Sequence, residues 1–267
     1  MKSFAGFLGV VLGCFSIDAA PALLKKWERG VAVHAPDEKG MVVWLWFYEW
    51  NMFSAATPGQ HTRGQWCNRV TVNKDGNRAI IDCRPNFQLE MKAVVDGAEL
   101  SLHATNKSGH DWPELAGIIA CFNPGPADIR NMQFANKKTF FHGPNGLVRL
   151  QKRNIHFNTA ISKAVEAEAK AGKYIWSDKW PKGEPNATVG LLVRESTNNQ
   201  WVTGIAWERF MSSQGHNPWQ CMHLGIHLGP LPQGKSRTVS GRIYLFKGKK
   251  ENLLERYLKD FHGSVQD

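Results

Sequence analysis

Short segments in which apolar and polar residues alternate, or in which apolar residues run together, recur along this chain between turn-forming residues. Such segments are typical of β-strands, whose successive side chains point to opposite faces of a sheet. The predicted strands are 30–34, 42–48, 68–73, 78–83, 88–95, 99–105, 117–122, 146–150, 189–194, 201–207, 221–229 and 235–246.

Turn signals separate these segments. Asp75-Gly76 and Asp96-Gly97 are dipeptides favoured in tight hairpins, and Gly143-Pro144 and Gly229-Pro230 mark further breaks. Asp96-Gly97, between MKAVV and AELSLHAT, predicts the clearest hairpin of the chain.

Only two segments have the pattern of an amphipathic helix. Residues 159–172 (TAISKAVEAEAKAG) place Ile161, Val165 and Ala169 four apart and end at a glycine, while residues 250–261 (KENLLERYLKDF) carry a leucine-rich stripe. Both stripes are expected to cover a sheet. The pattern predicts a mainly β fold, a large, supersandwich-like antiparallel β-sandwich with two peripheral helices, in which 21–267 form a single domain.

The N-terminus has the order of a secretory signal peptide over 1–20: Lys2, a short apolar run over 4–12, and small residues up to Ala20 and Ala22. The run is too short to span a bilayer, and no later stretch is long and apolar enough to be a transmembrane segment. A second interpretation is a lipid anchor at Cys14, within Val-Leu-Gly-Cys. Either way, the protein is predicted to be secreted or periplasmic.

The net charge of the chain limits the kinds of partner that we expect. The chain has a formal net charge of +10 and a pI near 9.5. The basic residues are scattered through strands and turns, with no basic helix and no RNA-binding motif, so we expect no nucleic acid partner. An exported basic protein suits an anionic polysaccharide or cell surface, and simple solubility is the other interpretation.

The cysteines suggest one disulfide. Cys67 and Cys83 flank the Asp75-Gly76 turn, whose pairing puts Asn68 opposite Cys83, and a one-residue bulge would then bring the two cysteines face to face. Cys121 and Cys221 are a second potential pair, and the sequence does not choose between connectivities. Their spacing matches no zinc-binding pattern.

Residues 44–66 form the leading candidate for a functional site. WLWFYEWNMFSAATPGQHTRGQW gathers Glu49, His61 and Arg63 among aromatic residues that include Trp50 and Trp66. Aromatic rings suit the apolar C–H face of a sugar, and the polar groups suit its rim. In a strand over 42–48, Trp44, Trp46 and Tyr48 point to one face of the sheet, and Leu45 and Phe47 point to the other. The competing interpretation is an aromatic core with Glu49 in an ion pair.

A second candidate group is NKSGHDWPELAG at 106–117. His110 lies beside carboxylates that can orient its ring, and Trp112 offers a stacking surface. Asp111 has a simpler interpretation as the N-cap of a short helix beginning at Pro113, with Glu114 in its first turn.

The third group is SSQGHNPWQCMHLGIHLG at 212–229, in which His216, Asn217 and Trp219 precede a predicted strand. His223 and His227 would face the same side of that strand about 13 Å apart, too far to share an ion. We therefore expect no metal and no cofactor.

Several stretches, WFYEWNMF, PGQHT, HDWPELAG, QGHNPW and GRIYLFKG, resemble a family of uncharacterised secreted β-rich proteins of environmental bacteria. The resemblance covers most of the chain and implies no assigned activity. Sandwich-type carbohydrate-active enzymes, including polysaccharide lyases and mutarotase-like proteins, are similar in architecture alone.

Together these features predict a secreted carbohydrate-active enzyme acting on a polysaccharide or oligosaccharide, as a lyase or a glycoside hydrolase. The alternative is a non-catalytic carbohydrate-binding or cell-envelope protein. The candidate catalytic residues, expected to converge on one concave face, are Glu49, His61, His110 and His216. The candidate substrate-binding residues are Arg63, Trp50, Trp66, Trp112, Glu114, Asn217 and Trp219.

In a lyase, Arg63 would neutralise the uronate carboxylate and one of the histidines would remove the adjacent proton. In a hydrolase, Glu49 would work with Asp111 or Glu114 across the glycosidic bond. The net positive charge favours an acidic substrate and the lyase.

Overall fold

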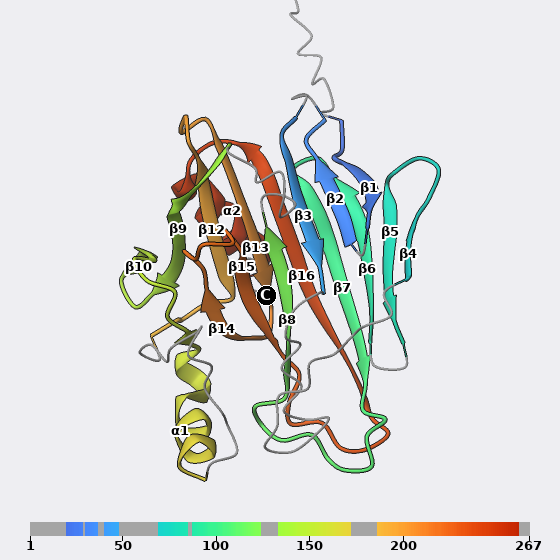
Figure 1. Cartoon of the computed structure of the whole chain (residues 1–267), viewed down its shortest axis with the longest axis vertical. Helices are drawn as coiled ribbons and strands as arrows, with labels where there is room; N and C mark the ends of the chain where they lie inside the picture. Colours follow the sequence, from blue (N-terminus) through green and yellow to red (C-terminus); the bar gives the residue numbers. More distant parts are fainter. Residues whose placement is uncertain are drawn as a thin grey trace, which may run out of the picture.

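The computed structural model describes residues 20–28, 30–36, 40–47, 69–84, 87–123, 133–171 and 186–261. Two antiparallel sheets of seven and nine strands face each other as a sandwich, and two helices lie at its periphery (Figure 1). This architecture confirms the fold class predicted from the sequence pattern.

The seven-stranded sheet has the order β1-β2-β3-β8-β15-β14-β11. Its strands are β1 (Leu23–Trp27), β2 (Gly30–His34), β3 (Val42–Trp46), β8 (Gly117–Asn123), β11 (His156–Phe157), β14 (Phe210–Gln214) and β15 (Met222–His227).

The nine-stranded sheet has the order β10-β9-β12-β13-β16-β7-β6-β5-β4. Its strands are β4 (Arg69–Val72), β5 (Arg78–Cys83), β6 (Phe87–Val94), β7 (Gly97–Thr105), β9 (Phe134–Gly143), β10 (Gly146–Arg149), β12 (Leu191–Ser196), β13 (Trp201–Trp207) and β16 (Ser236–Lys247).

Residues that alternate along the strands fill the space between the sheets. In β6, Leu89 and Met91 are buried while Glu90 and Lys92 are exposed. One apolar cluster takes residues from both sheets, so each sheet has an inner face toward this core and an outer face away from it.

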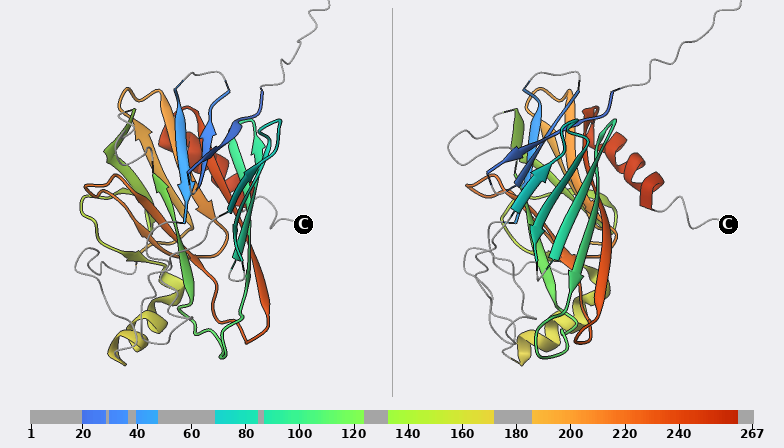
Figure 2. Two further views of the ribbon diagram at one scale, coloured as in Figure 1. Left: turned by 45° about the vertical axis from the view of Figure 1, so that its right-hand side comes forward. Right: turned by 90° about the vertical axis from the view of Figure 1, so that its right-hand side faces the viewer.

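Both predicted helices are present. A 3₁₀ turn (Thr159–Ile161) leads into α1 (Ser162–Lys170), and α2 (Lys250–Phe261) has the predicted bounds. Figure 2 shows α2 against the outer face of the nine-stranded sheet, where Leu253 and Tyr257 are buried among residues of β12, β13 and β16. Leu258 of the predicted stripe is exposed.

Most predicted strands occur within one or two residues of their expected bounds, and the Asp96-Gly97 hairpin joins β6 to β7 with Val94 opposite Gly97. Three strands of five or more residues were not predicted: β1, β9 and β14. In β1 and β9, adjacent lysines interrupt the apolar pattern, and β14 is short and rich in serine.

The Asp75-Gly76 hairpin has the predicted register, with Arg69 opposite Asp82. The bridge proposed for this hairpin is not supported: Cys83 is a buried thiol, and the described residues form no disulfide. Cys67 and Cys14 lie outside the described residues. Within the described part of the chain, no helix is long and apolar enough to cross a membrane.

Candidate functional site

The leading candidate segment falls largely outside the residues that the structure describes. Glu49, Trp50, His61, Arg63 and Trp66 all belong to the undescribed stretch 48–68. Their proposed roles stay predictions.

The strand that precedes this segment has the predicted alternation. In β3, Leu45 lies in the core with Val43, whereas Trp44 and Trp46 belong to a cluster on the outer face of the seven-stranded sheet. The tryptophans of this strand are therefore on the solvent side of the sheet.

The second candidate group forms a turn rather than a helix. Asp111 Oδ1 accepts a hydrogen bond from the backbone N–H of Gln233 (2.7 Å), so Asp111 fixes a loop and does not cap a helix. Trp112 is buried in the core and its indole N–H donates to Ser108 Oγ (3.0 Å). Trp112 is therefore not available as an exposed surface on which a sugar could stack.

His110 and Glu114 have different surroundings. The His110 carbonyl accepts a hydrogen bond from Asn106 Nδ2 (2.9 Å). The Glu114 carbonyl lies 2.6 Å from His227 Nε2, and the Glu114 carboxylate lies 3.6 Å from the same nitrogen. Burial lowers the pKa of His227, the hydrogen bond to the Glu114 carbonyl and the Glu114 charge oppose this change, and the charges of Arg209 and Arg237 add to it. Because a carbonyl oxygen only accepts, His227 Nε2 is the donor in this hydrogen bond.

The third candidate group forms the connection from β14 to β15. Asn217 organises it: Asn217 Oδ1 accepts from the backbone N–H groups of Trp219 (3.0 Å) and Cys221 (3.2 Å), and Asn217 Nδ2 donates to the Cys221 carbonyl (2.8 Å). His216 has a positive φ of 50°. Trp219 is exposed, with the Arg153 guanidinium 6.0 Å from its ring centroid.

The second and third groups do not converge. On the antiparallel pair β8 and β15, His227 is opposite Gly117 and Met222 is opposite Phe122. His110 precedes the Gly117 end of this pair and His216 precedes the Met222 end, about 17 Å away along the strands. The described members of the predicted catalytic set therefore lie at opposite ends of the strand pair.

A single row of side chains crosses the outer face of the seven-stranded sheet. Directly opposite residues of antiparallel strands share a face, and the register joins one residue from each of six neighbouring strands. The row contains Trp27, Gly30, Trp46, Cys121, His223 and Gln214.

Three tryptophans meet at one side of this row. The Trp27 and Trp46 ring centroids are 5.0 Å apart, and those of Trp27 and Trp44 are 6.4 Å apart in an edge-on arrangement. Trp27 and Trp44 are half-buried, so part of each ring is open. Lys25, which is exposed, lies in the row of Trp44, because both residues are directly opposite Ala32.

His34 lies on the same face at the end of β2. Burial lowers the pKa of His34, and the charge of Lys25 lowers it further. The outer face beside β1, β2 and β3 therefore combines aromatic rings, an imidazole and an ammonium group. We call this set (Lys25, Trp27, His34, Trp44 and Trp46) the tryptophan platform.

Next to the platform, Cys121, Cys221 and His223 gather on β8 and β15. Their ligand-type atoms, the two Sγ and a ring nitrogen, lie within 4.8 Å of one another, and all three residues are buried. His223 and His227 share a face of β15, as predicted, and the cysteines are much closer to His223. This cluster was not predicted from the sequence, although the spacing of Cys221 and His223 already places their side chains on one side of an extended segment.

A buried cation supports the same region from the inner side. Arg194 of β12 has no exposed surface, and its guanidinium donates to Thr139 Oγ1 (2.7 Å), the Gln220 carbonyl (2.7 Å) and Asn136 Oδ1 (3.1 Å). Burial lowers the pKa of Arg194 to about 9, and the Cys221 side chain opposes that change. Arg194 is still charged at neutral pH, and among the described residues no carboxylate pairs with it.

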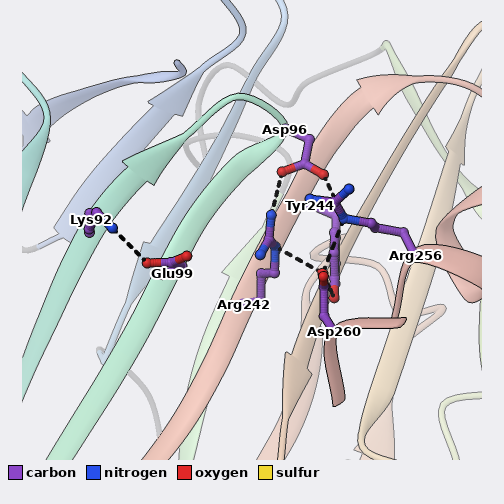
Figure 3. A network of polar contacts seen from close by, with 7 residues as sticks. All are labelled: Lys92, Asp96, Glu99, Arg242, Tyr244, Arg256 and Asp260. Carbon is purple, nitrogen blue, oxygen red and sulfur yellow. Dashed lines mark hydrogen bonds and ion pairs between the residues drawn. The ribbon is translucent and has the colours of Figure 1, made fainter. Parts of the chain in front are cut away.

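A groove of about 460 Å³ lies on the opposite side of the molecule, between α2 and the outer face of the nine-stranded sheet. Several of the acidic and basic groups around it pair with each other, whereas Arg78 and Glu90, which also line it, form no ion pair within the described part of the chain. Arg242 bridges Asp96 (2.6 Å) and Asp260 (3.3 Å), as Arg256 does (3.2 and 3.3 Å) (Figure 3).

This network ties α2 to the sheet. Asp260 also accepts a hydrogen bond from the Tyr244 hydroxyl (3.0 Å), and Lys92 pairs with Glu99 at 3.3 Å along the groove (Figure 3). Burial raises the pKa of Tyr244, and the Asp260 charge raises it further. Because these paired charges hold α2 against the sheet, we interpret this end of the groove as structural.

No family model and no curated protein matches this chain. Among solved structures it is similar to a galactose mutarotase related enzyme from Lactobacillus acidophilus, with 10% identity, 83% of this chain and 92% of that chain covered, and a TM-score of 0.42. A proposed aldose 1-epimerase from Escherichia coli K12 has 9% identity, 86% and 82% coverage and a TM-score of 0.33.

A proposed mutarotase from Salmonella typhimurium has 11% identity to this chain and a TM-score of 0.33. The similarity covers 85% of this chain and 94% of that chain. These similarities concern the arrangement of strands and assign no residue.

Proposed function

We propose that this protein is a carbohydrate-active enzyme that binds a sugar at the tryptophan platform. The observation that carries the proposal is the meeting of Trp27, Trp44 and Trp46 on the outer face of a sheet rather than in the core. Half-buried indole rings beside an imidazole and an ammonium group match a ring with an apolar face and a polar rim.

The charge of the platform favours an acidic sugar. Lys25 is exposed in the row of Trp44, and His34 stands one row further along the strands. The formal net charge of +10 acts in the same direction at longer range. Lys25 is the cation that the platform offers to a uronate or sulfate group bound above the rings.

The reaction class follows from the residues next to the platform in sequence. Glu49, His61 and Arg63 come after β3 and supply a carboxyl group, a base and a cation. We propose elimination on a uronate polysaccharide, in which Arg63 neutralises the carboxylate and His61 removes the adjacent C5 proton. A C4–C5 double bond then forms as the glycosidic C4–O bond breaks, and the leaving oxygen takes up a proton from water. Hydrolysis built on Glu49 is the second reaction class.

A non-catalytic carbohydrate-binding protein is the second candidate function. The separation of His110 from His216 favours it, because these two predicted acid–base residues precede opposite ends of the β8–β15 pair. In that function the platform supplies affinity and no bond is broken.

A panel of acidic and neutral polysaccharides separates these functions. Products are followed both by the absorbance of unsaturated uronates and by new reducing ends, since a hydrolase gives the second signal alone. Turnover of an acidic polymer that His61→Ala abolishes while binding persists supports the lyase. Binding without turnover supports the binding protein, and no binding to any glycan would overturn the proposal.

A further inference from the structure

We propose that Cys121, Cys221 and His223 bind one Zn²⁺ ion. The site is distinct from the tryptophan platform and does not depend on sugar binding. Three side chains of types that zinc prefers, two thiols and one imidazole, come together on the outer face of β8 and β15.

The strand register builds this cluster. Cys121 is directly opposite His223, and Cys221 precedes His223 by two residues, so all three side chains leave the sheet on one side. The relative exposures are 1% for Cys121, 3% for Cys221 and 3% for His223. Cys121 and His223 are held by the paired strands β8 and β15, and Cys221, directly before β15, is held by hydrogen bonds of its backbone to Asn217, which limits the rearrangement needed on binding.

The separations fit a tetrahedral ion. Zinc bonds of about 2.3 Å to sulfur and about 2.1 Å to nitrogen place neighbouring ligand atoms of this set about 3.6–3.8 Å apart. The three ligand atoms already lie within 4.8 Å of one another. Side-chain rotations that bring the ligand atoms about an ångström closer together reach the separations of a tetrahedral zinc site.

The same register disfavours a disulfide. Because Cys121 is opposite His223, Cys121 and Cys221 are diagonal neighbours on antiparallel strands, for which Cα separations of about 7–8 Å are typical. Disulfides span Cα separations of about 4.4–6.8 Å. An ion between two sulfur atoms bridges the diagonal without moving the strands.

Charge and fixed geometry favour the metal-binding form of Cys221. The Arg194 guanidinium donates to the carbonyl of Gln220, the residue before Cys221, and a nearby cation favours thiolate over thiol. Asn217 clamps the backbone of Cys221 through both its N–H and its carbonyl. We assign Asn217 as a positioning residue for this ligand.

The composition of the site selects the metal. Two thiolates balance the charge of a divalent ion, so the loaded site is neutral, as burial requires. Thiolate with imidazole suits zinc better than calcium or magnesium, which take oxygen ligands. Three protein ligands leave a fourth position for water or another small ligand.

The test uses the reduced, full-length folded protein. Zn²⁺ is added, free ion is removed by dialysis, and bound metal is measured per chain. Co²⁺ is added to a second sample, because cobalt in a tetrahedral thiolate site gives strong visible bands and a sulfur-to-metal charge-transfer band. We expect one zinc per chain and the cobalt spectrum of a site with two sulfur ligands.

The variants Cys121→Ser, Cys221→Ser and His223→Gln are expected to weaken zinc binding at least a hundredfold. The controls Cys83→Ser, a buried cysteine of the other sheet, and His227→Gln, on the same strand, should keep full binding. The wild-type cobalt spectrum needs no variant, so a variant that fails to fold leaves the proposal testable.

Three results would overturn the proposal: no retained zinc with reduced thiols, copper(I) binding without zinc binding, or loss of two thiols to a disulfide that forms readily between Cys121 and Cys221 on mild oxidation. Full zinc binding by Cys121→Ser would do the same, since the metal would then be elsewhere.

Discussion

Trp27 and Trp46 lie on either side of Gly30 in one row of the seven-stranded sheet, and their ring centroids are 5.0 Å apart at an interplanar angle of 59°. Strands β1 and β3 do not pair with each other; β2 lies between them. The rings meet because the residue between them has no side chain. Gly30 therefore lets two tryptophans from strands that are not neighbours form one surface.

We expect Gly30→Ala to destabilise the protein by about 1–3 kcal/mol. A Cβ at this position would lie 2.2 Å from the Leu45 carbonyl oxygen and 2.7 Å from Trp46 Cβ, so backbone must move to admit it. Denaturant unfolding measures the loss, and near-UV circular dichroism reports the change in the indole environment. The control is Gly109→Ala, where an added Cβ would meet no atom within 4 Å; an equal loss in both variants would contradict the account.

The ion-pair network under α2 is expected to matter for stability and not for ligand binding. Arg242→Met leaves Asp96 and Asp260 with one cation instead of two and should lower the free energy of unfolding by about 1–3 kcal/mol. Arg256→Met should have a smaller effect, because Arg256 is 40% exposed and its ion pairs are better solvated. Weaker sugar binding by a folded Arg242→Met protein would show that the groove is a ligand site.

Stability is expected to fall as the pH drops from about 7 to about 5. The pKa of His227 is lowered from 6.5, chiefly by burial, and the pKa of His34 is lowered for the same reason. Below pH 6.5 the unfolded chain takes up protons before the folded protein does, so acid favours unfolding until the folded pKa is reached. Well above pH 6.5 both histidines are neutral in the folded and in the unfolded state, and their contribution to stability is complete.

Thermal unfolding across this pH range tests the assignment. In His227→Gln the decline in melting temperature should be shallower than in wild type, and in the double variant with His34→Gln shallower still. A decline of unchanged steepness in both variants would place the sensitivity in other groups.

The first described residues limit where the predicted signal peptide can be removed. Ala22 is buried and its backbone N–H donates to the Val94 carbonyl (2.9 Å), and Leu24 N–H donates to Gly76 O (2.7 Å). We expect a signal peptidase to cut after Ala20, because a cut after Ala22 would remove the first of these bonds and leave a charged amine at the sheet edge. Intact mass measurement of the exported protein gives the site, and an unprocessed or lipid-modified chain would contradict the prediction.

Much of the fold could be predicted because local pattern and sheet structure agree. Strands such as β5 and β13 combine apolar runs with turn residues at both ends, and α2 has an uninterrupted stripe. Strand β9 was missed because Lys137 and Lys138 stand in its middle, where the Lys138 amino group bonds to the Ser196 and Thr197 carbonyls of the neighbouring segment. Because Ser196 and Thr197 are distant from Lys138 in the sequence, the sequence pattern does not indicate these hydrogen bonds.

The candidate site was harder to predict for the same reason. Cys121 and His223 become neighbours through the register of β8 and β15, and the tryptophan platform needs β1, which was not predicted. Sequence proximity suggested groups such as His110 with Asp111 and Trp112, whereas the fold uses those residues in a turn and in the core. Local clustering of polar residues marked loops more reliably than it marked a common site.

The measurement that tests the central claim most directly is titration of wild type, Trp44→Ala and Phe261→Ala with matched acidic and neutral oligosaccharides at two salt concentrations. Trp44 belongs to the platform, and Phe261 is a partly buried aromatic residue of the groove beside α2. The account predicts that Trp44→Ala weakens binding about tenfold or more (~1.4 kcal/mol), that Phe261→Ala leaves it unchanged, and that salt weakens the acidic ligand more than the neutral one. Binding that survives Trp44→Ala in a folded protein, or that is lost in Phe261→Ala, would contradict it.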